Sequence, residues 1–450
     1  MEMFLIRGGR TLSGTVRAGG SKNAALPILA ASLAIPGAVA IQGVPQLRDV
    51  STMLELLNSM GAITEQLNGA VQVYASDEIT TLAPYELVRQ MRASVCVLGP
   101  LVARFGLAKV SLPGGCNIGH RPIDLHLKGL AALGADIQLN SGYVIARCRR
   151  LKGADIDLMG PSGPTVTGTC NVMSAATLAV GCTIIRNAAR EPEVADLARF
   201  LNAAGARIQG AGTETLEIHG VDSLHSVAHT VIPDRIEAGT LAVAAAMTGG
   251  DITVQNAPVA SMSAFVDLLS HMGLSVESTD DSLRIRHRGE LRPVDFSAEP
   301  YPGIPTDLQA QLMALLALVP GESRVMDLVF PERFMHAAEL VRLGADVRVH
   351  GNTAVIHGVE KLSGAPVMAS DLRASAALVL AGLAAEGQTE LRRIYHLDRG
   401  YQAFEKKLNS LGAVIERLQD PLSPIMSGPH FGTTARSAES PELDRVFDQR

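Results

Sequence analysis

Leu130-Ala131-Ala132-Leu133-Gly134-Ala135-Asp136 is one of six related stretches in this chain of 450 residues. In each of them, a largely apolar stretch leads to a glycine, which an alanine or leucine follows. Successive glycines are 73, 71, 68, 71 and 68 residues apart, a regularity that chance does not produce. The sequence therefore predicts six copies of one structural unit, marked by Gly61, Gly134, Gly205, Gly273, Gly344 and Gly412.

Each stretch has the pattern of a helix that ends and a strand that begins. Met53, Leu57 and Met60 precede the first glycine at spacings of four and three, as on one face of a helix. A glycine at this point is typical of a helix C-terminus in left-handed geometry. After Gly134, the alternation over residues 135–139 predicts a strand with one buried face.

The repeat limits the possible architectures. Six units of about 70 residues are compatible with one ring, a solenoid or two domains of three units, and the chain length favours two domains. Because helices alternate with strands, the fold class is α/β, although the pattern does not decide how the strands pair. After about Asp420 the chain becomes rich in Pro, Ser, Gly and Thr, which predicts a mostly disordered tail over 421–450 with room for one short helix.

The composition excludes several functional classes. Hydrophobic residues make up 47% of the chain and charged residues 19%, which is typical of a globular protein. The net charge of −6 and the lack of a long basic run argue against nucleic acid and against an anionic membrane surface as partners. The five cysteines include no CxxC pair, so neither a disulfide framework nor a cysteine-based zinc site is expected. No signal peptide or membrane span is recognisable, and we expect a cytoplasmic location.

One cysteine lies in a glycine-rich stretch. The sequence LPGGCNIGHRP over residues 112–122 places Cys116 among three glycines, with His120 and Arg121 a few residues further on. Glycines favour a mobile loop, and nearby positive charge favours the thiolate form of a cysteine. From the residues, a reactive thiol and an incidental surface cysteine are about equally compatible with this pattern.

Two further stretches place polar residues at expected helix starts. Gly19-Gly20-Ser21-Lys22-Asn23 precedes an apolar run, and the free N–H groups at such a start favour an anion, although an ordinary helix cap is the commoner interpretation. Asp307 follows two prolines at another expected start. This pattern favours a helix N-cap over a proton-accepting carboxylate.

Cationic residues outside regular helix faces are the other candidates. Arg92, Arg121, Arg373 and Arg399 lie beside Pro, Gly or polar residues typical of turns. Each arginine by itself is more often part of a structural ion pair, and the sharper hypothesis is that Lys22, Arg121 and Arg399 bind one anion together. The histidines His120, His126, His336 and His396 show no metal-type spacing, so we expect structural roles for them and no metal site.

Several long motifs, taken together, resemble those of the enolpyruvyl transferases. They include GGSKNAALPILAASL at 19–33, LPGGCNIGHRPIDLH at 112–126, YPGIPTDLQAQ at 301–311, DLRASAALVLAG at 371–382 and IYHLDRGY at 394–401, and the resemblance covers roughly residues 1–418. It implies an inside-out α/β barrel of two domains with three βαβαββ-like units each. The first domain would comprise 1–21 plus 233–420 and the second 22–232, with the active site between them.

The resemblance also implies an activity. In the members of this family that the motifs match, the enolpyruvyl group of phosphoenolpyruvate is transferred to the 3′-hydroxyl of UDP-N-acetylglucosamine and phosphate leaves, in the first committed step of peptidoglycan precursor synthesis. No cofactor or metal is implied. Cys116 matches the general acid, which can also carry a covalent adduct and is the target of fosfomycin, and Asp307 matches the carboxylate that accepts the sugar hydroxyl proton. Lys22, Arg121 and Arg399 match the cations around phosphate and carboxylate.

The remaining implied site residues are substrate contacts. They are Asn23 beside Lys22, and Arg92, Arg121, Pro122, Ile123, Asp124, Leu125 and Val329 around the UDP-sugar, with Asp49, Arg333 and Arg373 at further cleft positions. The stretch 160–169 departs from the commonest family pattern, so its contacts to the nucleotide base are left open. Two alternatives also remain open: an enolpyruvylshikimate phosphate synthase, and a catalytically silent paralogue that binds a UDP-sugar.

Overall fold

The computed structural model describes residues 1–67, 69–114 and 122–421. Its repeating element is a four-stranded sheet, seen for example in β6 (Leu82–Ala83), β7 (Leu107–Ser111), β8 (Asp136–Asn140) and β9 (Tyr143–Arg147). The spatial order is β6-β7-β9-β8, in which β6 runs parallel to β7 and the other two pairs are antiparallel. Helices connect β6 to β7 and β7 to β8, so the unit is βαβαββ.

Five further sheets have the same order and the same strand directions. They are β16 (Val227–Thr230)-β3 (Gly37–Gln42)-β5 (Ala70–Ala75)-β4 (Ile63–Leu67), β10 (Asp155–Asp157)-β13 (Cys182–Arg186)-β15 (Thr215–His219)-β14 (Arg207–Gln209), β2 (Ser13–Arg17)-β17 (Asp251–Gln255)-β19 (Ser282–Arg286)-β18 (Ser275–Ser278), β20 (Phe296–Ala298)-β21 (Glu322–Asp327)-β23 (Thr353–His357)-β22 (Asp346–His350) and β24 (Pro366–Met368)-β25 (Gln388–Arg392)-β1 (Glu2–Arg7)-β26 (Val414–Gln419). The predicted α/β class and the six βαβαββ-like units are confirmed.

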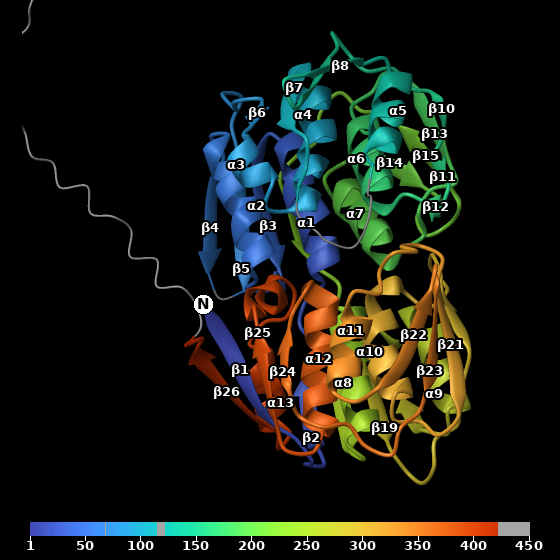
Figure 1. Cartoon of the computed structure of the whole chain (residues 1–450). Coiled ribbons are helices and arrows are strands. Elements are labelled where there is room, and N and C mark those ends of the chain that lie inside the picture. Colours follow the sequence, from blue (N-terminus) through green and yellow to red (C-terminus); the bar gives the residue numbers. More distant parts are fainter. Residues whose placement is uncertain (68, 115–121, 422–450) are drawn as a thin grey trace, which may run out of the picture.

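Helices form the interior, and the sheets lie around them (Figure 1). In one half of the molecule α1 (Lys22–Ala31), α4 (Leu98–Phe105) and α6 (Val166–Ala176) pack together. In the other half α8 (Arg235–Met247), α10 (Thr306–Leu316) and α12 (Leu372–Ala384) do the same, and almost every residue of these three helices is buried. Helices that are apolar on all sides are stable only when surrounded, which explains the inside-out arrangement.

The six glycines end the outer helices as predicted. These helices are α2 (Arg48–Ser59), α5 (Asp124–Ala132), α7 (Pro192–Ala203), α9 (Ser263–His271), α11 (His336–Arg342) and α13 (Phe404–Ser410), and each glycine that follows has φ between 94° and 106°. The strand after each glycine is an edge strand of its sheet. The predicted buried face is wrong for β8, where Ile137 is half-buried and Leu139 is 65% exposed, because an edge strand has a neighbour on one side only.

The buried apolar residues form two separate clusters. One extends from Ala24 to Val231, and the other combines residues 4–18 with residues 236–415. The chain passes between them twice, and the two crossings pair with each other: the Ser21 amide donates to the Ile232 carbonyl at 2.7 Å, and the Asp234 amide donates to the Gly19 carbonyl at 2.9 Å. The clusters support the division into 1–21 plus 233–420 and 22–232, which stays a prediction.

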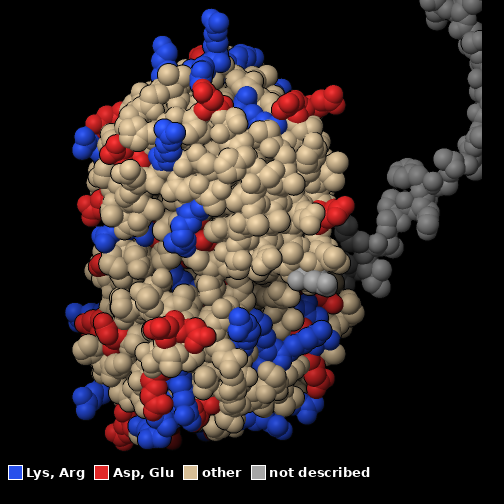
Figure 2. All heavy atoms as spheres, turned by 180° about the vertical axis from the view of Figure 1, so that it is seen from behind, with Lys and Arg blue, Asp and Glu red and all other residues tan. Residues whose placement is uncertain are grey.

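The remaining elements are short: η1 (Ser32–Ala34), α3 (Tyr85–Val88), η2 (Arg92–Val97), β11 (Met159–Gly160), β12 (Gly163–Pro164), η3 (Val259–Ser261) and η4 (Ile394–Arg399). Among the described residues, no helix has both the length and the apolar character needed to cross a membrane. On the face shown in Figure 2, acidic and basic side chains are interspersed. The predicted tail lies outside the described residues, except for Pro421.

Candidate active site

A cavity of about 530 Å³ lies between the two halves and is lined by residues of both. The N-terminal residues of five buried helices face it, namely those of α1, α6, α8, α10 and α12. Four of these helices carry a capping side chain, from Ser21, Thr165, Asp234 and Asp371. Because a helix N-terminus carries partial positive charge and unpaired N–H groups, their convergence makes the cavity favourable for anions.

Asp49 on α2 links two cations that line this cavity. Its carboxylate accepts a hydrogen bond from Lys22 Nζ at 3.1 Å and one from Arg399 Nε at 2.8 Å. Burial by itself raises the pKa of Asp49, but Lys22 and Arg399 outweigh this effect and hold the pKa below its usual value. Asp49 therefore stays ionised and fixes a lysine of its own half beside an arginine of the opposite half.

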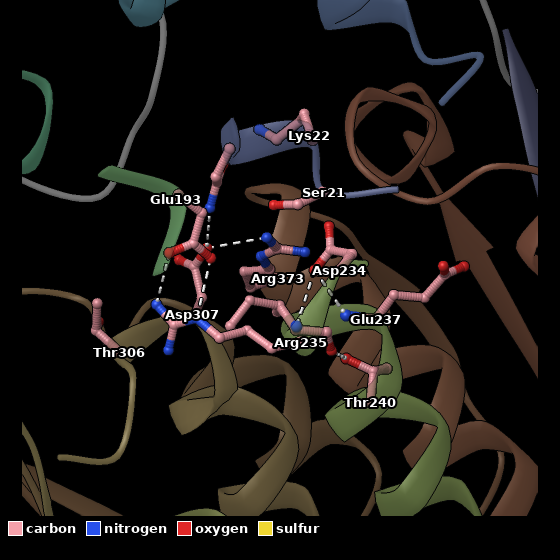
Figure 3. A network of polar contacts seen from close by, with 12 residues as sticks. Ser21, Lys22, Glu193, Asp234, Arg235, Glu237, Thr240, Thr306, Asp307 and Arg373 are labelled. Atoms are coloured by element: carbon pink, nitrogen blue, oxygen red, sulfur yellow. Dashed lines mark hydrogen bonds and ion pairs between the residues drawn. The ribbon is translucent and has the colours of Figure 1, made fainter. Parts of the chain in front are cut away.

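Asp307 lies in the first turn of α10 and faces two buried arginines, of which Figure 3 labels Arg373. Its Oδ1 is 2.8 Å from Arg333 Nη1, and its Oδ2 is 2.9 Å from Arg373 Nη2 and 3.5 Å from Asn23 Nδ2. Burial by itself raises the pKa of Asp307, but the two arginines outweigh this effect and hold the pKa well below its ordinary value. The interpretation as an N-cap is wrong: Pro305 is the cap residue, and the Asp307 carboxylate is used for ion pairs.

Arg373 is not on a turn, as its sequence context suggested, but in the first turn of α12. It is 1% exposed, and its guanidinium carbon lies 5.2 Å from the centre of the Tyr401 ring. Among the described residues, its Nε and Nη1 have no hydrogen-bond partner. Arg373 thus binds Asp307 through Nη2 and packs the rest of its guanidinium against the Tyr401 ring.

Glu193 and Arg235 form a buried ion pair between the halves, which the sequence interpretation did not assign. Arg235 Nε and Nη2 donate to the two Glu193 carboxylate oxygens at 2.9 and 3.2 Å. Glu191 lies nearby and accepts from the Tyr301 amide at 3.4 Å, and burial raises the pKa of Glu191. Nothing in the sequence near these residues indicated that α7 and α8 face each other.

Removing one partner of this pair should destabilise the protein. Glu193→Ala leaves the Arg235 cation buried without its bidentate partner, for which we expect a loss of roughly 3 kcal/mol in the free energy of unfolding. Urea denaturation followed by circular dichroism measures the effect. The matched control is Glu86→Ala, which removes an exposed ion pair of the same length, 2.9 Å to Arg89, and should cost under about 1 kcal/mol. Equal losses in the two variants would contradict the prediction.

The other predicted site residues fall into three groups. Lys22, Asn23, Arg92, Pro122, Asp124, Leu125, Asp307, Val329, Arg333, Arg373 and Arg399 all line the cavity. Ile123 is 9% exposed and belongs to the apolar cluster of its half. Cys116 and Arg121 lie outside the described residues. Of the stretch left open by the sequence, 160–169, residues 160–167 line the cavity next to Leu125 and include β12 of the small β11–β12 hairpin.

The described histidines of the sequence analysis lie outside the cavity lining. His126 is buried between Thr167 and Asn171, with its ring nitrogens 3.2 Å from Thr167 Oγ1 and 3.0 Å from Asn171 Nδ2. His336 is 1% exposed, and its Nε2 lies 3.3 Å from Met313 Sδ. Burial lowers the pKa of His336 to about 4, and Arg333 contributes in the same direction. His120 lies outside the described residues.

His336 should make the folding stability depend on pH. Because its pKa is near 6.5 in the unfolded chain and about 4 in the folded one, the unfolded chain binds the proton first. Stability is therefore complete above pH 6.5 and falls as the pH decreases towards 4, by at most about 3 kcal/mol. Urea denaturation at several pH values should show that the free energy of unfolding depends less on pH in His336→Leu than in the wild type. Replacing the exposed His350 on β22 with glutamine should leave this pH dependence unchanged.

Comparisons with known proteins agree with this arrangement. The family model described as EPSP synthase (3-phosphoshikimate 1-carboxyvinyltransferase) matches residues 6–408. The UDP-N-acetylglucosamine 1-carboxyvinyltransferase of Sorangium cellulosum is 54% identical, with 93% of this chain and 99% of that protein covered, and the enzyme of the same name from Geobacter metallireducens is 53% identical, with 93% and 100% covered.

Solved structures show the same fold. The enolpyruvyl transferase NikO from Streptomyces tendae superposes with a TM-score of 0.85 at 29% identity, covering 93% of this chain and 99% of that one. EPSP synthase from Acinetobacter baumannii has a TM-score of 0.71 at 18% identity, covering 93% and 100%, which shows the fold alone. The predicted resemblance is thus confirmed: this chain belongs to the enolpyruvyl transferase family, and within it to the group of UDP-N-acetylglucosamine 1-carboxyvinyltransferases.

Proposed function

We propose that this protein transfers the enolpyruvyl group of phosphoenolpyruvate to the 3′-hydroxyl of UDP-N-acetylglucosamine and releases phosphate. The observation that carries the proposal is a cluster of four cations in a cavity at the N-termini of buried helices. Arg333 and Arg373 pair with Asp307, and Lys22 and Arg399 pair with Asp49. Relatives that share more than half of the residues carry the name of this activity. The reaction belongs to peptidoglycan precursor synthesis, for which we infer a cytoplasmic location.

The cations suit a substrate with two anionic groups. Phosphoenolpyruvate carries a phosphate and a carboxylate, and guanidinium groups bind both with parallel hydrogen bonds. We assign Lys22, Arg121 and Arg399 to these groups. Asp49 holds Lys22 and Arg399 in place before the substrate arrives, which lowers the cost of ordering them on binding. The same cations stabilise the charge that builds up on phosphate as it leaves.

Proton transfer is assigned to Asp307 and Cys116. Asp307 accepts the proton of the sugar 3′-hydroxyl while the hydroxyl oxygen attacks carbon 2 of the enol. The Cys116 thiol gives a proton to carbon 3. The tetrahedral product then loses phosphate, and carbon 3 gives up a proton to restore the double bond. In the described structure, two arginines keep Asp307 strongly acidic. We infer that the substrate anions engage these arginines and so raise the basicity of Asp307 when both substrates are bound.

The UDP-sugar is assigned to the part of the cavity lined by Arg92, by residues of the segment 122–125 and by Val329. Arg92 on η2 donates to the Pro122 carbonyl at 3.0 Å and so connects η2 to the segment 122–125 at the start of α5. Val329 lies on the opposite side, where its amide and that of Phe330 are held by the Asp327 carboxylate at 3.0 and 2.7 Å. The 160–167 stretch faces the same region and is a candidate contact for the nucleotide base.

Phosphate release with two acceptors tests the proposal. The purified full chain is given phosphoenolpyruvate with UDP-N-acetylglucosamine, with shikimate 3-phosphate, or with neither. We expect release only with the UDP-sugar. Release with shikimate 3-phosphate instead would identify the enolpyruvylshikimate phosphate synthase activity. Tight binding of the UDP-sugar without any release would identify a silent paralogue, and either outcome would overturn the proposal.

A further inference from the structure

Three side chains of metal-binding types meet on the outer face of a sheet that is remote from the cavity. Cys182 lies on β13, and Glu217 and His219 lie on the neighbouring strand β15, at the outer side of one half of the molecule (Figure 1). None of the three lines the cavity between the halves. Within the described residues, this is the group in which three donors of the kinds Cys, His, Asp or Glu come close enough to hold one ion.

The strand register explains why they meet. Cys182 is the direct antiparallel partner of His219, and Ile184 is the partner of Glu217. Glu217 is two residues from His219 along β15, so the two side chains point to the same face of the sheet. Glu217 is thus the diagonal neighbour of Cys182, within reach across the strand pair. The positions are fixed by the ladder of strands β10, β13, β15 and β14 and do not depend on a loop.

The donor atoms are close to the arrangement that an ion requires. One sulfur, one imidazole nitrogen and one carboxylate oxygen all lie within 4.8 Å of one another, and His219 Nε2 is 2.8 Å from Glu217 Oε1. About half of each of the His219 and Glu217 side chains is exposed, and Cys182 is exposed as well. An ion from solution can therefore reach all three donors without any opening of the fold.

The chemistry of the donors selects the type of ion. Thiolate and imidazole prefer borderline-soft transition metals, whereas Mg²⁺ and Ca²⁺ prefer sites made only of oxygen donors. Three protein donors with a solvent-exposed fourth position is the arrangement of an open tetrahedral Zn²⁺ site. We propose that Cys182, Glu217 and His219 form a surface site for Zn²⁺ or a chemically similar ion such as Co²⁺, independent of the transferase reaction.

Binding requires a defined change of protons and partners. The Cys182 thiol loses its proton to solvent, and its sulfur becomes a ligand. The His219 proton moves to Nδ1, so that Nε2 and Glu217 Oε1 both coordinate the ion where they now share a hydrogen bond. Arg207 on β14 is the partner of His219 on its other side, and its positive charge limits the affinity of the site.

The experiment uses the thiol itself as the reporter, so that other cysteines do not confuse the result. The full chain is stripped of metal with a chelator and treated with iodoacetamide in the presence or absence of Zn²⁺, with Mg²⁺ as the comparison ion. Peptide mass spectrometry measures the rate at which Cys182 is modified. Co²⁺ titration, followed by the thiolate-to-cobalt absorption band, gives an independent reading of sulfur coordination. The variants are His219→Gln, Glu217→Gln and, as the matched control, Cys148→Ser.

We expect Zn²⁺, but not Mg²⁺, to slow alkylation of Cys182 by roughly tenfold or more, because coordinated sulfur is a poor nucleophile towards the reagent. His219→Gln should abolish the protection, Glu217→Gln should weaken it, and Cys148→Ser should leave it unchanged. Equal modification rates with and without Zn²⁺ would overturn the proposal. Undiminished protection in His219→Gln would overturn it too, since the thiol would then bind without the cluster. Transferase activity should be unaffected by Cys182→Ser, so the two proposals fail separately.

Discussion

Replacing Asp307 with asparagine should lower kcat on the order of 10²- to 10⁴-fold, the range expected for loss of a general base. Asparagine has nearly the same shape, but its amide cannot accept the proton of the sugar hydroxyl. It also removes the negative charge that Arg333 and Arg373 share at 2.8 and 2.9 Å. The measurement is phosphate release at saturating concentrations of both substrates.

The pH dependence of Asp307→Asn tests whether the wild-type carboxylate is ionised throughout the assay range. Because the arginines hold the pKa of Asp307 well below its ordinary value, the wild-type carboxylate is ionised throughout the assay range. The ratio of wild-type to variant rates should therefore stay constant from pH 6 to pH 9, the range of the assay. Asp267→Asn, an exposed carboxylate on α9, is the matched control and should leave kcat unchanged. A kcat of Asp307→Asn within a factor of a few of the wild type would contradict the assigned role.

Asp49→Ala should lower kcat/KM for phosphoenolpyruvate on the order of 10²- to 10³-fold, comparable to the loss of a preorganised group in an active site. Asp49 does not need to touch the substrate for this effect. It positions Lys22 and Arg399, and without it the two cations are expected to repel each other and separate. The larger part of the loss should appear as a raised KM for phosphoenolpyruvate, with KM for the UDP-sugar little changed.

Two further variants test this explanation. Asp49→Asn keeps an oxygen that can accept from Arg399 but loses the charge, so its loss should be intermediate. Asp77→Ala removes an ion pair of the same length as that between Asp49 and Arg399, 2.8 Å to Arg104, but with a carboxylate that is 93% exposed, and it should have no effect on KM. Equal KM values for phosphoenolpyruvate in the wild type and in Asp49→Ala would show that the pair does not position the cations.

The repeat could be recognised in the sequence because it depends on local backbone geometry. A helix that ends in a glycine with positive φ leaves a mark that can be recognised at each of the six sites. The pairing of strands from distant parts of the chain has no such signature in the sequence. β1 pairs with β25 and β26 from the far end of the chain, and β16 completes the sheet of β3. Such pairings join segments that are at least 188 residues apart, and no pattern within either segment specifies its partner.

The sequence likewise predicted some residues of the site and missed others. Lys22 and Arg399 were identified as parts of one anion site, and the structure brings both to Asp49. The local pattern around Asp307 pointed to a cap, because an aspartate near a helix start usually serves as one, whereas here a proline occupies that position. Glu193 and Arg235 were missed because each has its partner on the opposite half, and a single sequence contains no signal for that contact.

The mass of the product tests the central claim most directly. The full chain is incubated with phosphoenolpyruvate and UDP-N-acetylglucosamine, and the nucleotide sugar is recovered and analysed by mass spectrometry. We predict that it gains one enolpyruvyl group, in equal amount to the phosphate released, and that the gain is absent in Asp307→Asn. An unchanged UDP-sugar, whether or not phosphate appears, would contradict the account.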